Sequence, residues 1–180
     1  GFFHMRDRRR YGRRLLLAAA VSEIPYDLAF SGRWMDAQHQ NVCLTFFLAL
    51  VAMELLERYG NGIWEKLVLT AVFCTLTEAA GADGGAWGMG LVLAFYFCVI
   101  GNSGTNVPRY ILFHEKTAGG FMKMIAAVLI GAFAWQEPLW VLALTAVCLL
   151  LYDGYRGRSR FRSFFYIYYP AHLLVLYFLS

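Results

Sequence analysis

Charged residues are scarce in this chain. They make up 16% of its 180 residues, whereas a soluble domain usually carries about 25%. Hydrophobic residues reach 59%, and the mean hydropathy is +0.50. A water-soluble globule of this size has too little interior to bury so much apolar surface. The composition therefore excludes a cytosolic enzyme, a disordered tail and a fibrous repeat. It favours a membrane protein that crosses the bilayer several times and forms one domain over residues 1–180.

Signatures of several common sites are also missing. Each of the four cysteines lies inside an apolar run and none forms a CxxC pair, so neither a metal site nor a disulfide framework is expected. The histidines between the runs have no metal-ligand spacing, and the glycine-rich residues 101–104 match no phosphate-binding signature. The net charge of +4 does not indicate nucleic-acid binding, because the basic residues cluster between apolar runs and do not line one helix face.

The amino terminus lacks both a starting methionine and a recognisable signal peptide. The first five residues read like the end of a helix that begins upstream. We therefore expect the chain to lack an amino-terminal portion and to be incomplete as a catalyst on its own.

Seven apolar runs are present, separated by short polar breaks that are rich in turn residues. Most are about 15 to 18 residues long, at the short end of what spans a bilayer. They predict an all-α transmembrane bundle of about seven helices, with a short surface helix at residues 109–116. The runs cover residues 15–30, 42–56, 63–80, 87–100, 121–135, 139–152 and 164–179.

The basic residues agree with seven crossings. Fifteen of the sixteen Lys and Arg side chains fall in breaks on the same side as residues 6–14, and only Arg33 falls on the other side. Since cytoplasmic loops carry the excess of Lys and Arg, residues 6–14 are expected in the cytoplasm and Ser180 outside. The chain is therefore expected to be an integral membrane protein.

Cysteine labelling tests this topology. A membrane-impermeant thiol reagent applied to intact cells is expected to label a Gln38→Cys variant and to leave a Ser159→Cys variant unlabelled, because the two positions lie on opposite sides of the predicted membrane. Equal labelling of both positions, or labelling of position 159 alone, contradicts the topology.

Glu23 is the most informative single residue. It lies roughly 15 Å along the first predicted helix from its cytoplasmic end. A carboxylate at that depth must be paired, be protonated or face a wet cavity. Pro25 removes a backbone donor and frees a carbonyl near Val21, which favours a kinked helix with a polar site. The alternative is a structural hydrogen bond from Glu23 to a neighbouring helix.

His172 lies at a similar depth, roughly 12 Å into the last predicted helix. A carboxylate beside this imidazole would orient it and make it more basic, which suits a general base. The alternative is a bond to a carbonyl freed by Pro170. We predict that Glu23 and His172 share one polar cavity, so that the first and last helices are neighbours or are joined through Asn41 or Thr45.

Further polar residues are candidates for the site. Asn41 and Thr45 are spaced to share a face of the second helix. Glu78 and Asp83 bracket a corner of small residues near the outer surface. They are expected either to bind an acceptor amine or a cation, or to cap helices.

Four strings together resemble the TraX family of conjugal-transfer membrane proteins, and the resemblance covers nearly the whole chain. The family implies a polytopic inner-membrane protein whose founding member acetylates the amino terminus of F pilin. Its fold is thought similar to that of membrane acyltransferases that use cytosolic acyl-CoA. The strings are residues 13–15 leading to 22–30 (SEIPYDLAF), 41–46 (NVCLTF), 82–84 (ADG) and 165–173 (FYIYYPAHL).

The resemblance implies an integral membrane acyltransferase that moves acetyl from acetyl-CoA to an amine or hydroxyl acceptor, such as the amino terminus of a pilin-like peptide. A non-enzymatic membrane subunit, a small transporter and an inactive fragment are the alternatives. The chain departs from the family pattern where upstream helices with a histidine are absent, and where Gly84 replaces an aromatic residue. The implied residues are His172 and Glu23 for catalysis, Tyr169, Asn41, Thr45, Glu78 and Asp83 for substrate, and Arg13 and Arg14 for the cofactor phosphates.

Overall fold

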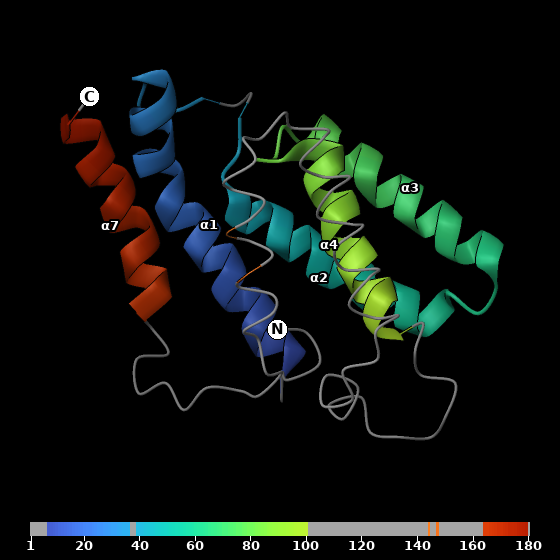
Figure 1. Cartoon of the computed structure of the whole chain (residues 1–180). Coiled ribbons are helices and arrows are strands. Elements are labelled where there is room, and N and C mark those ends of the chain that lie inside the picture. Colours follow the sequence, from blue (N-terminus) through green and yellow to red (C-terminus); the bar gives the residue numbers. More distant parts are fainter. Residues whose placement is uncertain (1–6, 37–38, 101–143, 145–146, 148–163, 180) are drawn as a thin grey trace. The chain divides into compact units, whose positions relative to one another are not determined.

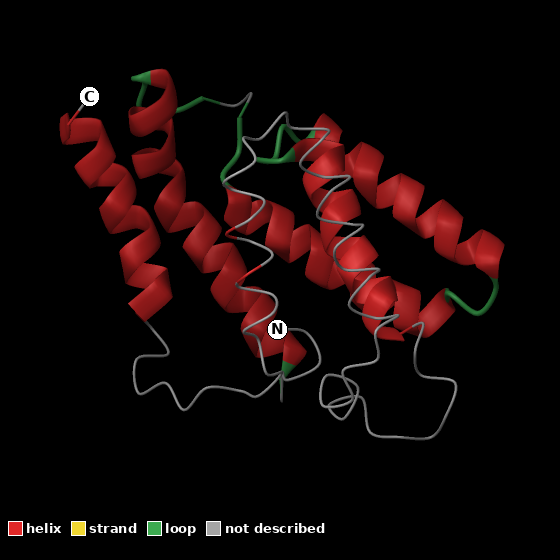
Figure 2. Cartoon of the chain, viewed as in Figure 1, coloured by secondary structure: helices red, strands yellow, loops and turns green. Residues whose placement is uncertain are grey.

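The computed structural model describes residues 7–36, 39–100, 144, 147 and 164–179. These residues are mostly helical, with short connections between the helices (Figure 2). The prediction of an all-α fold is confirmed for this part of the chain. Its named helices are α1 (Arg8–Ser31), α2 (Val42–Tyr59), α3 (Ile63–Ala79), α4 (Gly85–Ile100) and α7 (Phe164–Leu179).

The chain divides into two compact units. One takes in Met5–Met89 and Arg158–Ser180, and the other takes in Gly1–His4 and Gly90–Gly157. The first unit holds α1, α2, α3, the start of α4, and α7. Every site residue proposed from the sequence belongs to this first unit.

The helices α2, α3, α4 and α7 follow the predicted apolar runs closely, but α1 begins well before the predicted Leu15. Asp7 is the N-cap of α1, and its side chain accepts a hydrogen bond from the backbone N–H of Arg10 at 3.0 Å. Arginine is a good helix former, so most of the basic segment 6–14 forms the first turns of α1. The runs at 121–135 and 139–152 and the surface helix at 109–116 lie outside the described residues.

The carboxyl end of α1 is set by a glycine. The helix continues through Pro25 and ends at Gly32, which has a φ of 66° and a left-handed backbone. That conformation closes a helix at little steric cost only in glycine. The chain then turns toward the start of α2.

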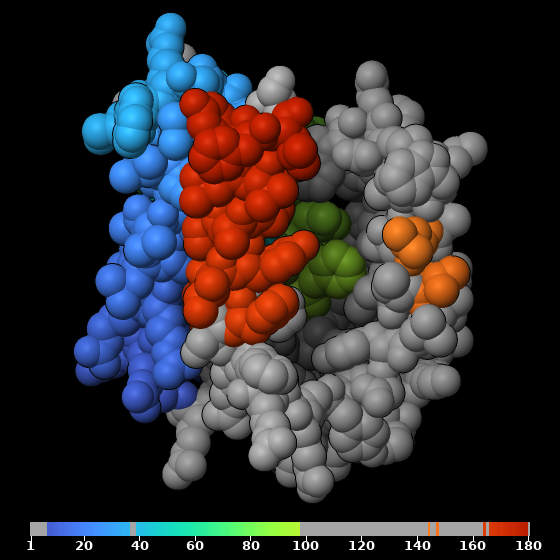
Figure 3. Space-filling model, turned by 90° about the vertical axis from the view of Figure 1, so that its left-hand side faces the viewer, coloured from blue at the N-terminus to red at the C-terminus, as the bar shows by residue number. Residues whose placement is uncertain are grey.

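The first unit is built around α1. It packs along α7 and also against α2, and α3 packs against α2 (Figure 1). The core where these helices meet contains Ala18, Ala19 and Cys43, with Tyr166 and Tyr169 of α7 packed against it. Small residues let helices approach closely. A space-filling view shows α7 lying beside α1 (Figure 3).

Several polar side chains are buried, and many large apolar side chains are exposed. In a soluble protein large apolar side chains are mostly buried and polar ones mostly exposed. Here several polar side chains are at most 2% exposed, while large apolar side chains of α3 and α7 face outward. The buried polar residues are Ser22, Asp27, Asn41, Thr45 and Thr77. The outward apolar residues include Trp64, Leu67 and Val68 of α3, and Ile167, Val175, Phe178 and Leu179 of α7.

The named helices are between 16 and 24 residues long. Across the part of the chain that the structure describes, no helix combines enough length with enough hydropathy to cross a membrane. The seven-crossing arrangement stays a prediction.

Candidate functional site

Asn41 connects α1 to α2. It is completely buried and is the N-cap of α2, where its side-chain oxygen accepts a hydrogen bond from the Cys43 N–H at 3.0 Å. Its amide group donates to the carbonyl of Ala19 at 2.8 Å and also to Oε2 of Glu23. Both amide hydrogens and the amide oxygen therefore have partners, which fixes the orientation of the side chain.

Glu23 has two oxygens in different situations. Oε2 accepts from the Asn41 side chain and faces the Asn41 backbone N–H at 3.4 Å. Oε1 is buried and has no hydrogen-bond partner within the described residues. Leaving a buried acceptor unpaired costs free energy, so Oε1 is an open position for a donor group on a ligand. The bond with Asn41 at the start of α2 matches the structural alternative, in which Glu23 bonds to a neighbouring helix.

Asp27 lies one turn beyond Glu23 and is only 2% exposed. Its Oδ2 accepts from the backbone N–H of Asp36 at 2.8 Å, which ties the α1–α2 connection to α1. Its Oδ1 has no partner within the described residues. No role for Asp27 was predicted from the sequence. The signal that could have found it is its spacing of four residues from Glu23, which places both carboxylates on one side of α1.

The start of α2 is also joined to the α3–α4 connection. Gln40 N–H donates to the Gly81 carbonyl at 2.8 Å, and Asp83 N–H donates to the Gln40 carbonyl at 2.8 Å. The Thr45 hydroxyl donates to the Asp83 carbonyl at 2.7 Å. Thr45 is buried, whereas the Asp83 side chain is exposed. The structure thus brings Asn41, Thr45 and the backbone of Asp83 together.

Tyr169 brings α7 to the same place. Its phenol oxygen lies against the backbone N–H of Val42, the residue after Asn41. Cys43, Asp83 and Tyr26 are within electrostatic range of that oxygen. Four of the residues proposed from the sequence therefore gather at the amino end of α2. We name Glu23, Asn41, Thr45 and Tyr169 the Asn41 cluster.

His172 lies on the same helix as Tyr169 but makes other contacts. Its Nδ1 bonds to the Tyr168 carbonyl at 3.2 Å, and its ring stacks on Tyr168 with centroids 5.2 Å apart. None of its contacts among the described residues is to Glu23. A backbone bond was the expected alternative, although the carbonyl that Pro170 deprives of a partner belongs to Tyr166. The helices α1 and α7 are neighbours, but a cavity shared by Glu23 and His172 stays a prediction.

Glu78 acts at the start of α4. Its Oε2 accepts from the Ala86 N–H at 2.8 Å. Gly85 has a φ of 51°, and the Glu78 carboxylate fills the space that a Cβ at Gly85 would occupy. This arrangement matches the helix-capping alternative and accounts for the glycine.

The two arginines proposed for cofactor binding lie on different sides of α1. Arg14 is within electrostatic range of the phenol of Tyr166 on α7. Burial raises the pKa of the Tyr11 phenol, which lies near Tyr166 and Cys43. Arg14 and the phenols of Tyr11 and Tyr166 therefore lie along the contact between α1 and α7, on the way to the Asn41 cluster.

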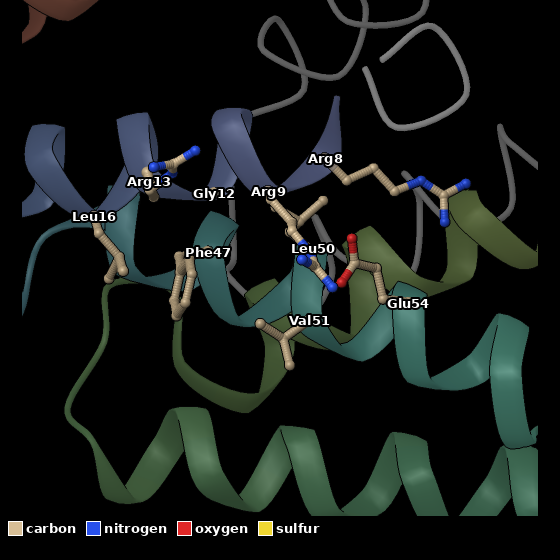
Figure 4. Close-up of a pocket in the computed structure, with 9 residues that line it drawn as sticks. All are labelled: Arg8, Arg9, Gly12, Arg13, Leu16, Phe47, Leu50, Val51 and Glu54. Atoms are coloured by element: carbon tan, nitrogen blue, oxygen red, sulfur yellow. The ribbon is translucent and has the colours of Figure 1, made fainter. Parts of the chain in front are cut away.

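Arg13 lines a groove of about 460 Å³ between α1 and α2 (Figure 4). The α1 side of this groove is formed by Arg8, Arg9, Gly12, Arg13 and Leu16, and the α2 side by Phe47, Leu50, Val51 and Glu54. Arg8, Arg9 and Glu54 lie toward one end of the groove, and Arg13 lies with Leu16 and Phe47 toward the other (Figure 4).

The groups gathered in the Asn41 cluster are a carboxylate, an amide, a hydroxyl and a phenol, which can hold and move protons. Cys43 beside them is a free thiol. In the described ranges, no three His, Cys, Asp or Glu side chains converge in a way that would hold a metal ion.

Comparison with known proteins identifies a family. The family model described as TraX protein matches residues 1–180, the whole chain. No curated protein and no solved structure matches the chain.

Proposed function

We propose, since this chain belongs to the TraX family, that it is an integral membrane acyltransferase. The family match confirms the resemblance found in the sequence. In this proposal the protein transfers acetyl from cytosolic acetyl-CoA to an amine or hydroxyl acceptor, such as the amino terminus of a pilin-like peptide. The observation that carries the proposal is the unpartnered, buried Oε1 of Glu23 in the Asn41 cluster.

A membrane location is supported by the many large apolar side chains on the surface and the polar side chains buried between the helices. Lipid tails, unlike water, can cover exposed Leu, Val and Phe side chains while the polar groups pair inside. Trp34 after α1 and Trp64 at the start of α3 are 74% and 75% exposed. They fall on opposite sides of the predicted membrane, as in an aromatic belt. In the proposal, the protein is embedded in the lipid bilayer, and residues 6–14 face the cytoplasm.

The Asn41 cluster supplies the groups that acyl transfer needs. Acetyl-CoA, when bound, supplies an activated thioester whose C–S bond is exchanged for a C–N or C–O bond to the acceptor. Glu23 takes the proton of the acceptor at Oε1 and returns it to the leaving thiolate. Asn41 holds Oε2 and so aims Oε1. Tyr169 donates its phenol hydrogen to the thioester oxygen as negative charge develops there. Thr45 holds the Asp83 backbone at the edge of this site.

His172 is the second base in the proposal. A carbonyl oxygen can only accept, so the bond to Tyr168 requires the proton on Nδ1. In the neutral ring Nε2 is then unprotonated and can accept a proton. His172 relays protons between Glu23 and the cytoplasmic side. Asp83 and Glu78 border the acceptor on the outer side of the site.

Arg14 is the proposed contact for the cofactor phosphates, since arginine pairs with phosphate through charge-assisted hydrogen bonds. The phenols of Tyr11 and Tyr166 continue from Arg14 toward Cys43. The acetyl end of the cofactor would follow this α1–α7 contact to the Asn41 cluster. Arg13 lines the groove between α1 and α2 and is not needed for this path.

A second candidate function has its own support. Ser22, Glu23 and Asp27 each leave one buried oxygen without a partner along α1, within the described residues. In a non-enzymatic membrane subunit or small transporter, such oxygens would form a path for a polar solute. Binding of acetyl-CoA by the full-length protein favours the transferase, and its absence favours the path.

A tyrosine pair tests the transferase. In the full-length protein, Tyr169→Phe is expected to lower thiol release from acetyl-CoA about 100-fold or more with an amine acceptor, because the oxyanion donor is lost. Tyr168→Phe is the matched control, since Tyr168 is exposed and its ring contacts survive. Equal activity of the two variants contradicts the role of Tyr169, and no thiol release by the unaltered protein contradicts the transferase.

A further inference from the structure

The groove between α1 and α2 changes character along its length. Arg8, Arg9 and Glu54 lie toward one end, and Arg13 lies above Leu16 and Phe47 toward the other (Figure 4). Charged side chains beside an apolar surface match a ligand with a charged head and an apolar tail. The groove lies at the amino end of α1, where the sequence predicts the cytoplasmic membrane surface.

The arginines of the groove differ in how they are held. Arg8 forms an ion pair with Glu57, with Nη1 and Oε2 at 2.6 Å. Arg9 and Arg13 are spaced by four residues on one side of α1 and are exposed. Within the described residues they form no ion pair with an acidic side chain. Their side chains are long enough to turn toward one phosphate group placed between them, which can accept hydrogen bonds from both.

The apolar end exists because α1 and α2 approach closely at Gly12. A Cβ added at Gly12 would lie 3.3 Å from Leu50 Cδ2 and 3.6 Å from Phe47 Cε2. The groove floor at this point is therefore backbone on one side and apolar side chains on the other. That surface fits a hydrocarbon chain and offers it no polar group.

We propose that this groove binds an anionic glycerophospholipid. The phosphodiester contacts Arg9 and Arg13, and one acyl chain lies along Leu16, Phe47 and Leu50. Basic pockets between membrane helices on the cytoplasmic side bind anionic headgroups in this way. Glu54 accepts hydrogen bonds from headgroup hydroxyls, which favours a glycerol headgroup. Its negative charge opposes a ligand with several phosphates, so acetyl-CoA suits the groove less well.

The inference rests on the proposed membrane location and not on acetyl transfer. Binding is measured without acetyl-CoA, using full-length protein in a neutral detergent and short-chain phosphatidylglycerol as the probe. Short-chain phosphatidylcholine is the comparison lipid, because its ammonium group is repelled by the arginines. A protein that releases no thiol from acetyl-CoA can still pass this test, and an active transferase can fail it.

Phosphatidylglycerol is expected to bind, and phosphatidylcholine to bind at least ten-fold more weakly. Arg9→Gln with Arg13→Gln is expected to weaken phosphatidylglycerol binding about 25-fold, at about five-fold for each arginine. Arg10→Gln is the matched control: the same substitution on the same helix, at an exposed arginine that does not line the groove. It is expected to change binding less than two-fold.

A second variant tests the apolar end without removing charge. Gly12→Leu fills the groove floor and is expected to weaken binding of short-chain phosphatidylglycerol. Glycerol phosphate has no acyl chain and is expected to bind neither the unaltered protein nor the variant measurably. Equal binding of the two lipids overturns the proposal. An equal loss in Arg10→Gln, or displacement of phosphatidylglycerol by acetyl-CoA at similar concentration, overturns it too.

Discussion

Replacing Asn41 by alanine is expected to destabilise the protein by about 3 to 7 kcal/mol. Loss of the N-cap of α2 costs about 1 kcal/mol. The carbonyl of Ala19 and the carboxylate of Glu23 would each lose a buried donor, at about 1 to 3 kcal/mol each. A typical domain is stable by only about 5 to 15 kcal/mol, so this is a large fraction. Thermal unfolding of the detergent-solubilised full-length protein measures the change.

Two further variants separate the causes. Asn61→Ala is the control, because Asn61 is exposed in the α2–α3 connection. It is expected to change stability by less than about 0.5 kcal/mol. Asn41→Asp keeps an oxygen that can cap α2 but loses the amide donors and sets a second carboxylate against Glu23. It is expected to be nearly as unstable as Asn41→Ala. If Asn41→Ala unfolds at the same temperature as Asn61→Ala, the buried network is not a stabilising element.

Hydropathy alone located most of the described helices. The apolar runs at 42–56, 63–80 and 164–179 correspond closely to α2, α3 and α7, because a sustained apolar stretch leaves few alternatives to a helix. The spacing of Asn41 and Thr45 also predicted that the two would share a face, and both are buried. These features depend on periods of a few residues, which a single sequence displays directly.

Features that depend on pairing between distant segments were not predictable in the same way. The contact of Gln40 with residues 81–83 joins two connections far apart in the chain. No local pattern marks such a pairing. The orientation of His172 toward Tyr168 depends on its rotamer, which the sequence does not specify. The early start of α1 was missed because its arginines resemble a polar break, although Asp7 is a recognisable cap.

The convergence on Asn41 was predictable only in part. A carboxylate deep in an apolar helix indicated a partner on another helix, and Asn41 was one of two linking residues considered. Tyr169 was placed near the substrate through the family resemblance. Depth along the helix singles out Glu23, the residue nearest the predicted centre of the membrane, whereas burial in the structure is greater at Asp27 than at Glu23.

Replacing Glu23 by glutamine is expected to lower acetyl transfer by the full-length protein about 100- to 10,000-fold, the usual contribution of a general base. Glutamine has nearly the same shape, and its amide oxygen can still accept from Asn41, so the α1–α2 connection survives. What it loses is the ability to take a proton at the position of Oε1. The turnover number is expected to fall while KM changes little, since the substitution acts on the step in which the acceptor is deprotonated.

The pH profile distinguishes this role from a structural one. A carboxylate base must be ionised to work, so activity of the unaltered protein is expected to fall on the acidic side as Glu23 takes up a proton. The glutamine variant has no group to titrate there, and its residual activity should lose that acidic limb. Glu65→Gln is the matched control, because Glu65 is exposed in the first turn of α3. If Glu23→Gln keeps more than a tenth of the activity of that control, Glu23 serves to tie α1 to α2 and the proton is taken elsewhere, with His172 next to be tested.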